Sequence, residues 1–351
     1  MKRSLYLLLA LLALAAMALS ACGPAATPVP TEVPQPTDVP QPTEEPKPTE
    51  VPPTPEPTAA PELGTADNPL IMALAPSATT QELQTGGEAI AAKLSEMTGY
   101  TIKTVVPTNY AAMIEAMGAG QAHIGWLAPT QYVVAHGKGY ADVALATIRF
   151  GSDHYGFQYV ANAEAGFTSY YDAATGKSTA DAATALAQFA DKKPCWTDPL
   201  SSSGYVLPSG VLAQNGIKVK TGAFVQGHPT VIKSIYLSPK GEICDFGATF
   251  IDARSNVVND FPDVNDKVVI IWVSEPFIPN DNVSFATSVP AEIREKLTQA
   301  LLDLAGTEDG RALLKSGGYS IEGLKVVDDT FYDEYRLYLE ASGIDPTTLF
   351  K

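Results

Sequence analysis

Short strand-like segments alternate with helix-like segments along the chain from about residue 68 onward, and this alternation limits the fold more than any other feature of the sequence. Apolar runs at 70–73 and 100–106 flank a helical pattern. Thr79 and Glu82 have the spacing of a capping box at its start, and Gly99 ends its periodicity. Strands that alternate with helices predict an α/β fold whose parallel sheets are covered on both faces.

The alternating pattern divides into two units. It is interrupted near Gly151, resumes with a strand at 157–161, and returns towards the first unit after a β-rich run at 268–273. We therefore expect two α/β lobes, one formed by residues 65–153 together with 280–351 and the other by residues 154–279. Two crossings between lobes suggest a hinged cleft, and ligands of parallel sheets collect at the carboxyl ends of the strands.

The first 64 residues have a different character. Residues 1–21 combine Lys2 and Arg3 with a short apolar run, which predicts a secretory signal peptide rather than a spanning helix. The Leu-Ser-Ala-Cys tetrad that ends at Cys22 resembles a bacterial lipobox, in which the cysteine is lipidated; an ordinary N-terminal helix is the alternative. Residues 22–64 are rich in Pro, Thr and Glu and predict a semi-rigid tether. We expect an extracytoplasmic, lipid-anchored protein.

The formal net charge of −16 argues against nucleic acid and against anionic lipid surfaces as partners. An acidic protein can still capture an anion at a local site. Residues 198–205, Asp-Pro-Leu-Ser-Ser-Ser-Gly-Tyr, lie between a strand-like and a helix-like segment. Ser201, Ser202 and Ser203 would surround the free N–H groups of a first helical turn, where the macrodipole favours negative charge. This pattern predicts an oxyanion site without Lys or Arg; a plain serine N-cap is the alternative.

Metal and cofactor sites are not indicated. Cys195 and Cys244 can form a disulfide in an exported chain or remain two buried thiols. The chain contains no P-loop pattern, so ATP chemistry is expected elsewhere. The histidines lack metal-ligand spacing: His123, His136, His154 and His228. We expect no metal and no cofactor.

Several motifs come in the order seen in one family of proteins. They are residues 108–113 (Thr-Asn-Tyr-Ala-Ala-Met), 124–129 (Ile-Gly-Trp-Leu-Ala-Pro), 198–205, 227–228 (Gly-His), 245–249 (Asp-Phe-Gly-Ala-Thr) and 278–281 (Ile-Pro-Asn-Asp). With them, the chain resembles the phosphonate/phosphite-binding proteins of ABC importers from about residue 68 to about 320. The resemblance implies a type II periplasmic-binding-protein fold. It also implies a monomer that captures a small phosphorus oxyanion and delivers it to a membrane permease.

The resemblance also implies roles for individual residues. Tyr110 and Tyr155 would contribute phenol hydroxyls from the two sides of the cleft, and the three serines would donate to phosphoryl oxygens. His228 would donate from its imidazole, and Thr130 would face the ligand from another helix start. Asp252 and Asp281 align with positions that accept the ammonium of aminoalkylphosphonates. The alternatives are packing aromatics, a helix cap at His228 and a turn at Asp281, while Asp198 is expected to fix the serine loop.

The choice of anion stays open at this point. Thr often stands in the family where this chain has Ser202, and Asp252 is one methylene shorter than the Glu of some relatives. A carboxylate beside a phosphoryl dianion requires an ammonium or a proton between them, so the ligand is an aminoalkylphosphonate or a protonated oxyanion such as phosphite or phosphate. Two alternative functions are a sulfonate receptor on the same fold and a hydrolase whose catalytic triad would consist of a serine of the loop, His228 and Asp252. We expect no enzyme, because the chain lacks a G-x-S-x-G elbow.

Overall fold

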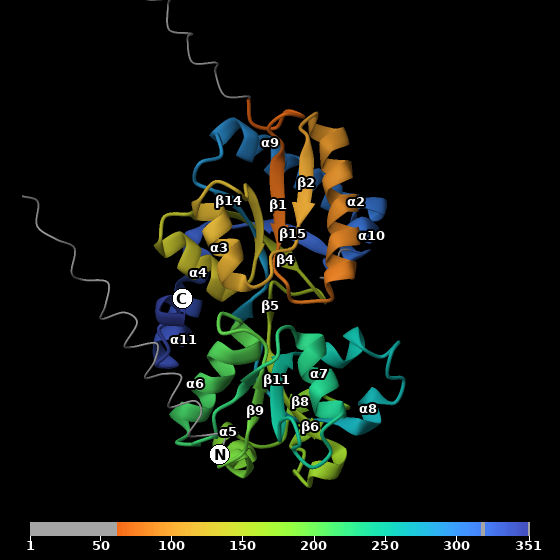
Figure 1. Cartoon of the computed structure of the whole chain (residues 1–351), viewed down its shortest axis with the longest axis vertical. Coiled ribbons are helices and arrows are strands. Elements are labelled where there is room, and N and C mark those ends of the chain that lie inside the picture. Colours follow the sequence, from red (N-terminus) through yellow and green to blue (C-terminus); the bar gives the residue numbers. More distant parts are fainter. Residues whose placement is uncertain (1–61, 317–319, 350–351) are drawn as a thin grey trace, which may run out of the picture. The chain divides into compact units, whose positions relative to one another are not determined.

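The computed structural model describes residues 62–316 and 320–349, which form two α/β lobes joined by two short crossings (Figure 1). The predicted signal peptide (1–21), Cys22 and the tether up to residue 61 lie outside the described residues. Within the described ranges, no helix has the length and apolar character needed to cross a membrane.

The first lobe, lobe 1, contains a six-stranded sheet in the order β15-β4-β14-β3-β1-β2. Its strands are β1 (Leu70–Leu74), β2 (Ile102–Val105), β3 (Ile124–Leu127), β4 (Ala141–Ile148), β14 (Asn282–Ala286) and β15 (Gly323–Val326). Its helices are α2 (Thr80–Thr98), α3 (Tyr110–Gly118), α4 (Pro129–Gly137), α9 (Ala291–Gly306) and α10 (Glu308–Ser316). The helix α2 packs with α9 and α10, and α3 packs with α4.

The predicted start and end of α2 are confirmed. Thr79 is the N-cap, and its hydroxyl accepts the Glu82 amide and donates to the Glu82 carboxylate at 2.6 Å. The Glu82 side chain thus contacts the Thr79 hydroxyl rather than the Thr79 backbone amide, so the predicted capping box is only half formed. Gly99 ends the helix with φ 76°, a left-handed conformation that glycine adopts without a Cβ penalty.

The second lobe, lobe 2, contains a five-stranded sheet in the order β10-β9-β11-β6-β12. Its strands are β6 (Phe157–Asn162), β9 (Pro194–Trp196), β10 (Ala223–Phe224), β11 (Phe246–Phe250) and β12 (Val268–Val273). Its helices are α5 (Ala182–Leu186), α6 (Leu207–Gln214), α7 (His228–Tyr236) and α8 (Val264–Lys267), and β7 (Tyr171–Asp172) pairs with β8 (Lys177–Ser178) beside it.

The expectation of purely parallel sheets is wrong at three strands. In lobe 1, β14 runs antiparallel between β3 and β4, and the edge strand β15 runs antiparallel to β4; in lobe 2, β6 runs antiparallel between β11 and β12. Strands β6 and β14 are each the first long strand after the chain has crossed from the other lobe. Each begins at the side where the parallel strands end, and it therefore runs in the opposite direction to them.

The crossings are formed by β5 (His154–Tyr155) and β13 (Ile278–Pro279), which pair antiparallel with each other. The boundaries expected from sequence, 153/154 and 279/280, fall at these strands. Helix α11 (Asp333–Ala341), expected within the first lobe, contacts both lobes. It packs against α6 of lobe 2, where Gln214 donates to the Ala341 carbonyl, and its Tyr335 hydroxyl contacts Thr130 of lobe 1.

Cys195 and Cys244 form a disulfide, which decides between the two alternatives left by the sequence. Cys195 lies in β9, and Cys244 lies two residues before β11, the neighbouring strand. Their Cα atoms are 5.5 Å apart. Both residues are fully buried, so the bond ties two adjacent strands inside the core of lobe 2.

Candidate functional site

A small cavity of about 20 Å³ lies between the lobes, at the carboxyl ends of parallel strands. A larger depression of about 400 Å³ shares Ala78 and Tyr110 with it and is lined by residues of both lobes, among them Thr80 and Lys233. The small cavity is lined by Ser77, Ala78, Tyr110, Ala128, Arg149, Tyr155, Ser201, Ser202, Ser203, His228, Phe250, Asn256 and Asp281. Seven of the nine residues predicted to bind ligand are among them.

The serine loop is the N-terminal end of a helix, as the sequence predicted. Ser201 is the N-cap and accepts the Gly204 amide at 3.1 Å. The helix begins with a π-helical turn at Ser202–Val206 and continues as α6. Asp198 holds the loop, because its carboxylate accepts the Leu200 amide at 2.8 Å and the Tyr110 amide of lobe 1 at 3.5 Å. The serine hydroxyls are thus presented to the cavity by a fixed backbone.

Thr130, predicted to face the ligand, supports the serine loop from behind and does not line the cavity. Pro129 is at the first position of α4, where backbone N–H groups have no partner within the helix. The Thr130 amide donates to the Ser202 hydroxyl at 3.1 Å, and the two hydroxyls are 2.8 Å apart. The Thr130 hydroxyl also contacts the Tyr335 hydroxyl at 2.6 Å. Ser202 is therefore anchored to lobe 1 through a buried chain of hydrogen bonds.

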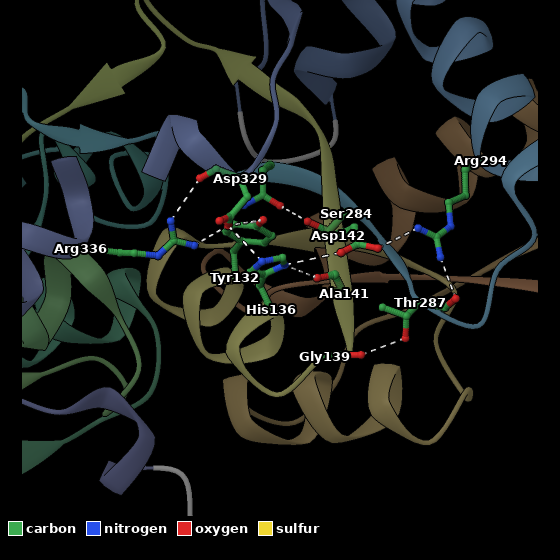
Figure 2. Close-up of polar contacts among 11 residues, drawn as sticks. Tyr132, His136, Gly139, Ala141, Asp142, Ser284, Thr287, Arg294, Asp329 and Arg336 are labelled. Atoms are coloured by element: carbon green, nitrogen blue, oxygen red, sulfur yellow. Dashed lines mark hydrogen bonds and ion pairs between the residues drawn. The ribbon is translucent and has the colours of Figure 1, made fainter. Parts of the chain in front are cut away.

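The segment that carries Tyr335 is fixed to lobe 1 by a polar network (Figure 2). The Tyr132 hydroxyl donates to Asp329 at 2.8 Å, and Arg336 forms an ion pair with the same carboxylate. His136 lies between Asp329 and Asp142, at 3.4 and 3.5 Å. These contacts tie Asp329, at the start of the turn before α11, to lobe 1, and Arg336 of α11 to Asp329, so the Tyr335 hydroxyl is placed where it meets Thr130.

His228 is a neutral hydrogen-bond donor in the cavity wall. It is the first residue of α7, follows Gly227 with φ 83°, and is 3% exposed. The Phe250 amide donates to its Nδ1 at 3.4 Å, so the proton of the neutral ring is on Nε2. Burial, together with the positive charge of Arg149, lowers the pKa of His228 to about 3. The imidazole therefore stays uncharged and can donate one hydrogen bond through Nε2.

Tyr155 and Asp281 complete the lining from the crossing segments. The Tyr155 hydroxyl donates to Ser203 at 3.4 Å, and burial raises its pKa well above the ordinary value, so it remains protonated. Burial also raises the pKa of Asp281 to about 6, although Arg149 opposes this rise. A carboxylate in this position can accept a proton or a hydrogen bond from a ligand near neutral pH.

Arg149 was not predicted from the sequence, and the expectation of a site without Lys or Arg is wrong. It follows β4, and its backbone exchanges two hydrogen bonds with Ser152, at 2.9 and 3.0 Å. Phe150 and Gly151, between them, have φ 51° and 73°, the left-handed values of a tight hairpin turn. The Arg149 Nε is buried and has no hydrogen-bond partner among the described residues. The sequence signal that could have identified Arg149 is a cationic residue at the end of a strand, directly before a crossing between the lobes.

Asp252 is the second predicted residue that does not reach the cavity. Arg254, two residues further on, binds its carboxylate through Nε at 3.0 Å and Nη2 at 2.6 Å. Burial alone would raise the pKa of Asp252, but the bonds from Arg254 hold it below the ordinary value. The carboxylate is therefore engaged in an ion pair and is not part of the cavity lining.

Two α/β lobes, joined by two crossings around a small polar cavity, define a type II periplasmic binding protein. Two solved structures share this fold at low sequence identity. A binding protein component of an ABC phosphonate transporter from Pseudomonas aeruginosa is 18% identical, with a TM-score of 0.65 over 78% of this chain and 87% of that one. PhnD1 from Prochlorococcus marinus, in complex with methylphosphonate, is 14% identical, with a TM-score of 0.64 over 77% of this chain and 96% of that one.

The sequence comparison identifies the family more specifically than the fold does. Residues 72–332 match the family of periplasmic substrate-binding proteins of phosphonate ABC transporters, and the chain belongs to this family. The phosphate-import protein PhnD of Mycolicibacterium smegmatis is 25% identical over 218 residues. That match covers 59% of this chain and 63% of the relative, less than two thirds of its length. Because the family is periplasmic, the chain acts outside the cytoplasm.

Proposed function

We propose that this chain is the solute-binding component of an ABC importer and that its cavity captures a phosphonate- or phosphite-type oxyanion. The observation that carries the proposal is the set of donors around one small cavity: three buried serine hydroxyls at a helix start, the neutral imidazole of His228 and the phenol of Tyr155. Donors at a helix N-terminus favour an anion, and the cavity size favours a compact one.

Capture involves closure of the two lobes on the ligand. The bonds from Thr130 to Ser202 and from Tyr110 to Asp198 join lobe 1 to lobe 2 directly beside the cavity. These bonds support a closed form in which both lobes contact the anion, and an open form is expected to lack them. The closed, loaded protein then delivers its ligand to a membrane permease. The leader sequence supports a lipid anchor at Cys22, and we propose that the protein works as a monomer.

The site supports binding without catalysis. A hydrolytic triad would require a carboxylate on His228 and a base beside a serine hydroxyl. The His228 Nδ1 accepts a backbone amide, and Asp252 is paired with Arg254. The Ser202 hydroxyl is bonded to Thr130. A phosphate or sulfonate receptor on the same fold is the second candidate, and the phosphate-import relative favours phosphate among these.

Calorimetry with phosphite, phosphate, methylphosphonate, 2-aminoethylphosphonate and taurine tests the proposal. We expect a phosphorus compound to bind most tightly. The His228→Ala variant should lose about 10- to 100-fold in affinity, since a hydrogen bond to a charged group contributes about 1.5–3 kcal/mol. His123→Ala is the matched control, because His123 precedes β3 at the end away from the cavity and should leave affinity unchanged. Preference for taurine would disprove the proposed substrate class.

A further inference from the structure

The two charged side chains of the cavity come from one rigid corner of the crossings. Arg149 ends the segment that leaves lobe 1, and Asp281 begins the segment that returns to it. The Asp281 carbonyl accepts both the amide and the hydroxyl of Thr147, at 2.9 and 2.8 Å. Asn280 donates to the carbonyls of Thr147 and Ser152, on either side of Arg149. The backbone positions from which the two charged side chains project are therefore fixed relative to each other.

Arg149 is not neutralised by a direct ion pair. Among the described residues, no carboxylate oxygen lies within 4.0 Å of its guanidinium, and its buried Nε has no acceptor. The guanidinium lies 5.5 Å from the centroid of the Phe250 ring, a contact that leaves its charge uncompensated. Its positive charge acts on three groups of the cavity wall: Asp281, His228 and Tyr155. Since His228 and Tyr155 are neutral, the cavity contains one unpaired cation, one carboxylate and several neutral donors.

This charge pattern is unfavourable for a ligand that carries an ammonium group. An ammonium near Asp281 would also lie near the Arg149 guanidinium, in a buried place where like charges repel strongly. The second carboxylate expected to receive an ammonium, Asp252, already has Arg254 as its partner. The small cavity also gives a charged arm little room to turn away.

A singly protonated oxyanion matches the same pattern. Its P–OH group can donate to the Asp281 carboxylate, and its remaining oxygens can accept from Arg149, the serine hydroxyls and the His228 Nε2. With one negative charge, such a ligand compensates Arg149 and avoids repulsion from Asp281, because the shared proton lies between the two oxygens. The bound anion would also give the buried Arg149 Nε an acceptor, which it lacks among the described residues.

We infer that Arg149 and Asp281 together select a protonated oxyanion without an ammonium group, such as phosphite, phosphate or an alkylphosphonate, over an aminoalkylphosphonate. This inference rests on the proposed function and narrows its substrate class. Arg149 is a specificity-determining residue in it: it attracts the anion and excludes the cationic substituent.

Two ligands of nearly the same shape test the inference: ethylphosphonate and aminomethylphosphonate, which differ in a methyl against an ammonium group. Their affinities are measured by calorimetry near neutral pH. The unmodified chain should bind ethylphosphonate at least 30-fold more tightly. The Arg149→Gln variant should lose most of this preference, with a ratio below threefold, whereas Arg149→Lys should keep it because the charge remains. Arg311→Gln, the same change far from the cavity, should leave both affinities unchanged.

The outcomes separate the inference from the proposed function. Tighter binding of aminomethylphosphonate would overturn the inference while the proposed function stands. Equal losses for both ligands in Arg149→Gln would also overturn it, since they would show a merely structural role. If the unmodified chain bound no phosphorus compound but did bind taurine, the proposed function itself would fail.

Discussion

Replacing Asp281 with Asn should stabilise the ligand-free protein at neutral pH, although Asp281 belongs to the proposed binding site. Asp281 is 9% exposed as a residue, and burial raises the pKa of its carboxyl group from 3.8 to about 6. This difference corresponds to about 3 kcal/mol, as an upper bound. Because the folded pKa is the higher one, the contribution to the free energy of unfolding is fully present below about pH 4 and is lost as the pH rises through about 6. Asn does not titrate, so it avoids this loss.

Urea unfolding of the ligand-free proteins at several pH values measures the effect. The free energy of unfolding of Asp281→Asn should exceed that of the unmodified chain by up to about 3 kcal/mol near pH 7.5, and the difference should vanish near pH 4. His228, whose pKa is lowered to about 3, has the opposite dependence: its contribution is present above about pH 6.5 and is lost as the pH falls through about 3. It is common to both proteins and cancels in the comparison.

The matched control is Asp67→Asn, which removes an exposed carboxylate. It should change the free energy of unfolding by less than about 0.5 kcal/mol at each pH. A difference for Asp281→Asn that is constant across the pH range would refute the reasoning, and so would a variant less stable than the unmodified chain at neutral pH.

Two further changes test the geometry of lobe 2. In Gly204→Ala, the added Cβ would lie 1.9 Å from the Thr197 Oγ1, so the serine loop must shift by about 1 Å. Affinity for methylphosphonate, measured by calorimetry, should therefore fall by about 100-fold. Gly137→Ala is the control, because its Cβ meets nothing within 4 Å, and equal affinities of the two variants would contradict the prediction. Replacing both Cys195 and Cys244 with Ala opens a loop with a sequence separation of 49 residues and should lower the free energy of unfolding by about 4 kcal/mol in urea titrations, on the chain-entropy estimate. A loss below about 1 kcal/mol would show that the bond contributes little.

The sequence predicted those features of the fold that depend on local signals. The N-cap at Thr79, the glycine stop at Gly99 and the helix start at Ser201 all depend on residues within one turn of each other, and all are found. The α/β class and the type II fold also follow from the order of strands and helices together with the family motifs. The antiparallel directions of β6, β14 and β15 do not, because strand direction depends on where the chain enters a sheet.

The site was predicted less completely, because several of its contacts join residues that are distant in sequence. Thr130 supports Ser202 and contacts Tyr335, a partner 205 residues further along the chain. Asp252 was misplaced for the opposite reason: Arg254, only two residues away, competes for its carboxylate. Arg149 could not be predicted from the helix N-termini, because this cation projects from the end of a strand at the crossing.

The location of Arg149 and Asp281 beside β5 and β13 has a consequence for the sequence of events during capture. In a rotation, atoms near the axis travel little and atoms at the rim travel far. Thr80 and Lys233, which line the outer depression, would therefore undergo the large displacements of opening. The backbone at Arg149 and Asp281 would move little throughout. An arriving solute would thus be sorted by its charge at first encounter, before the lobes have met, and its shape would be tested only afterwards.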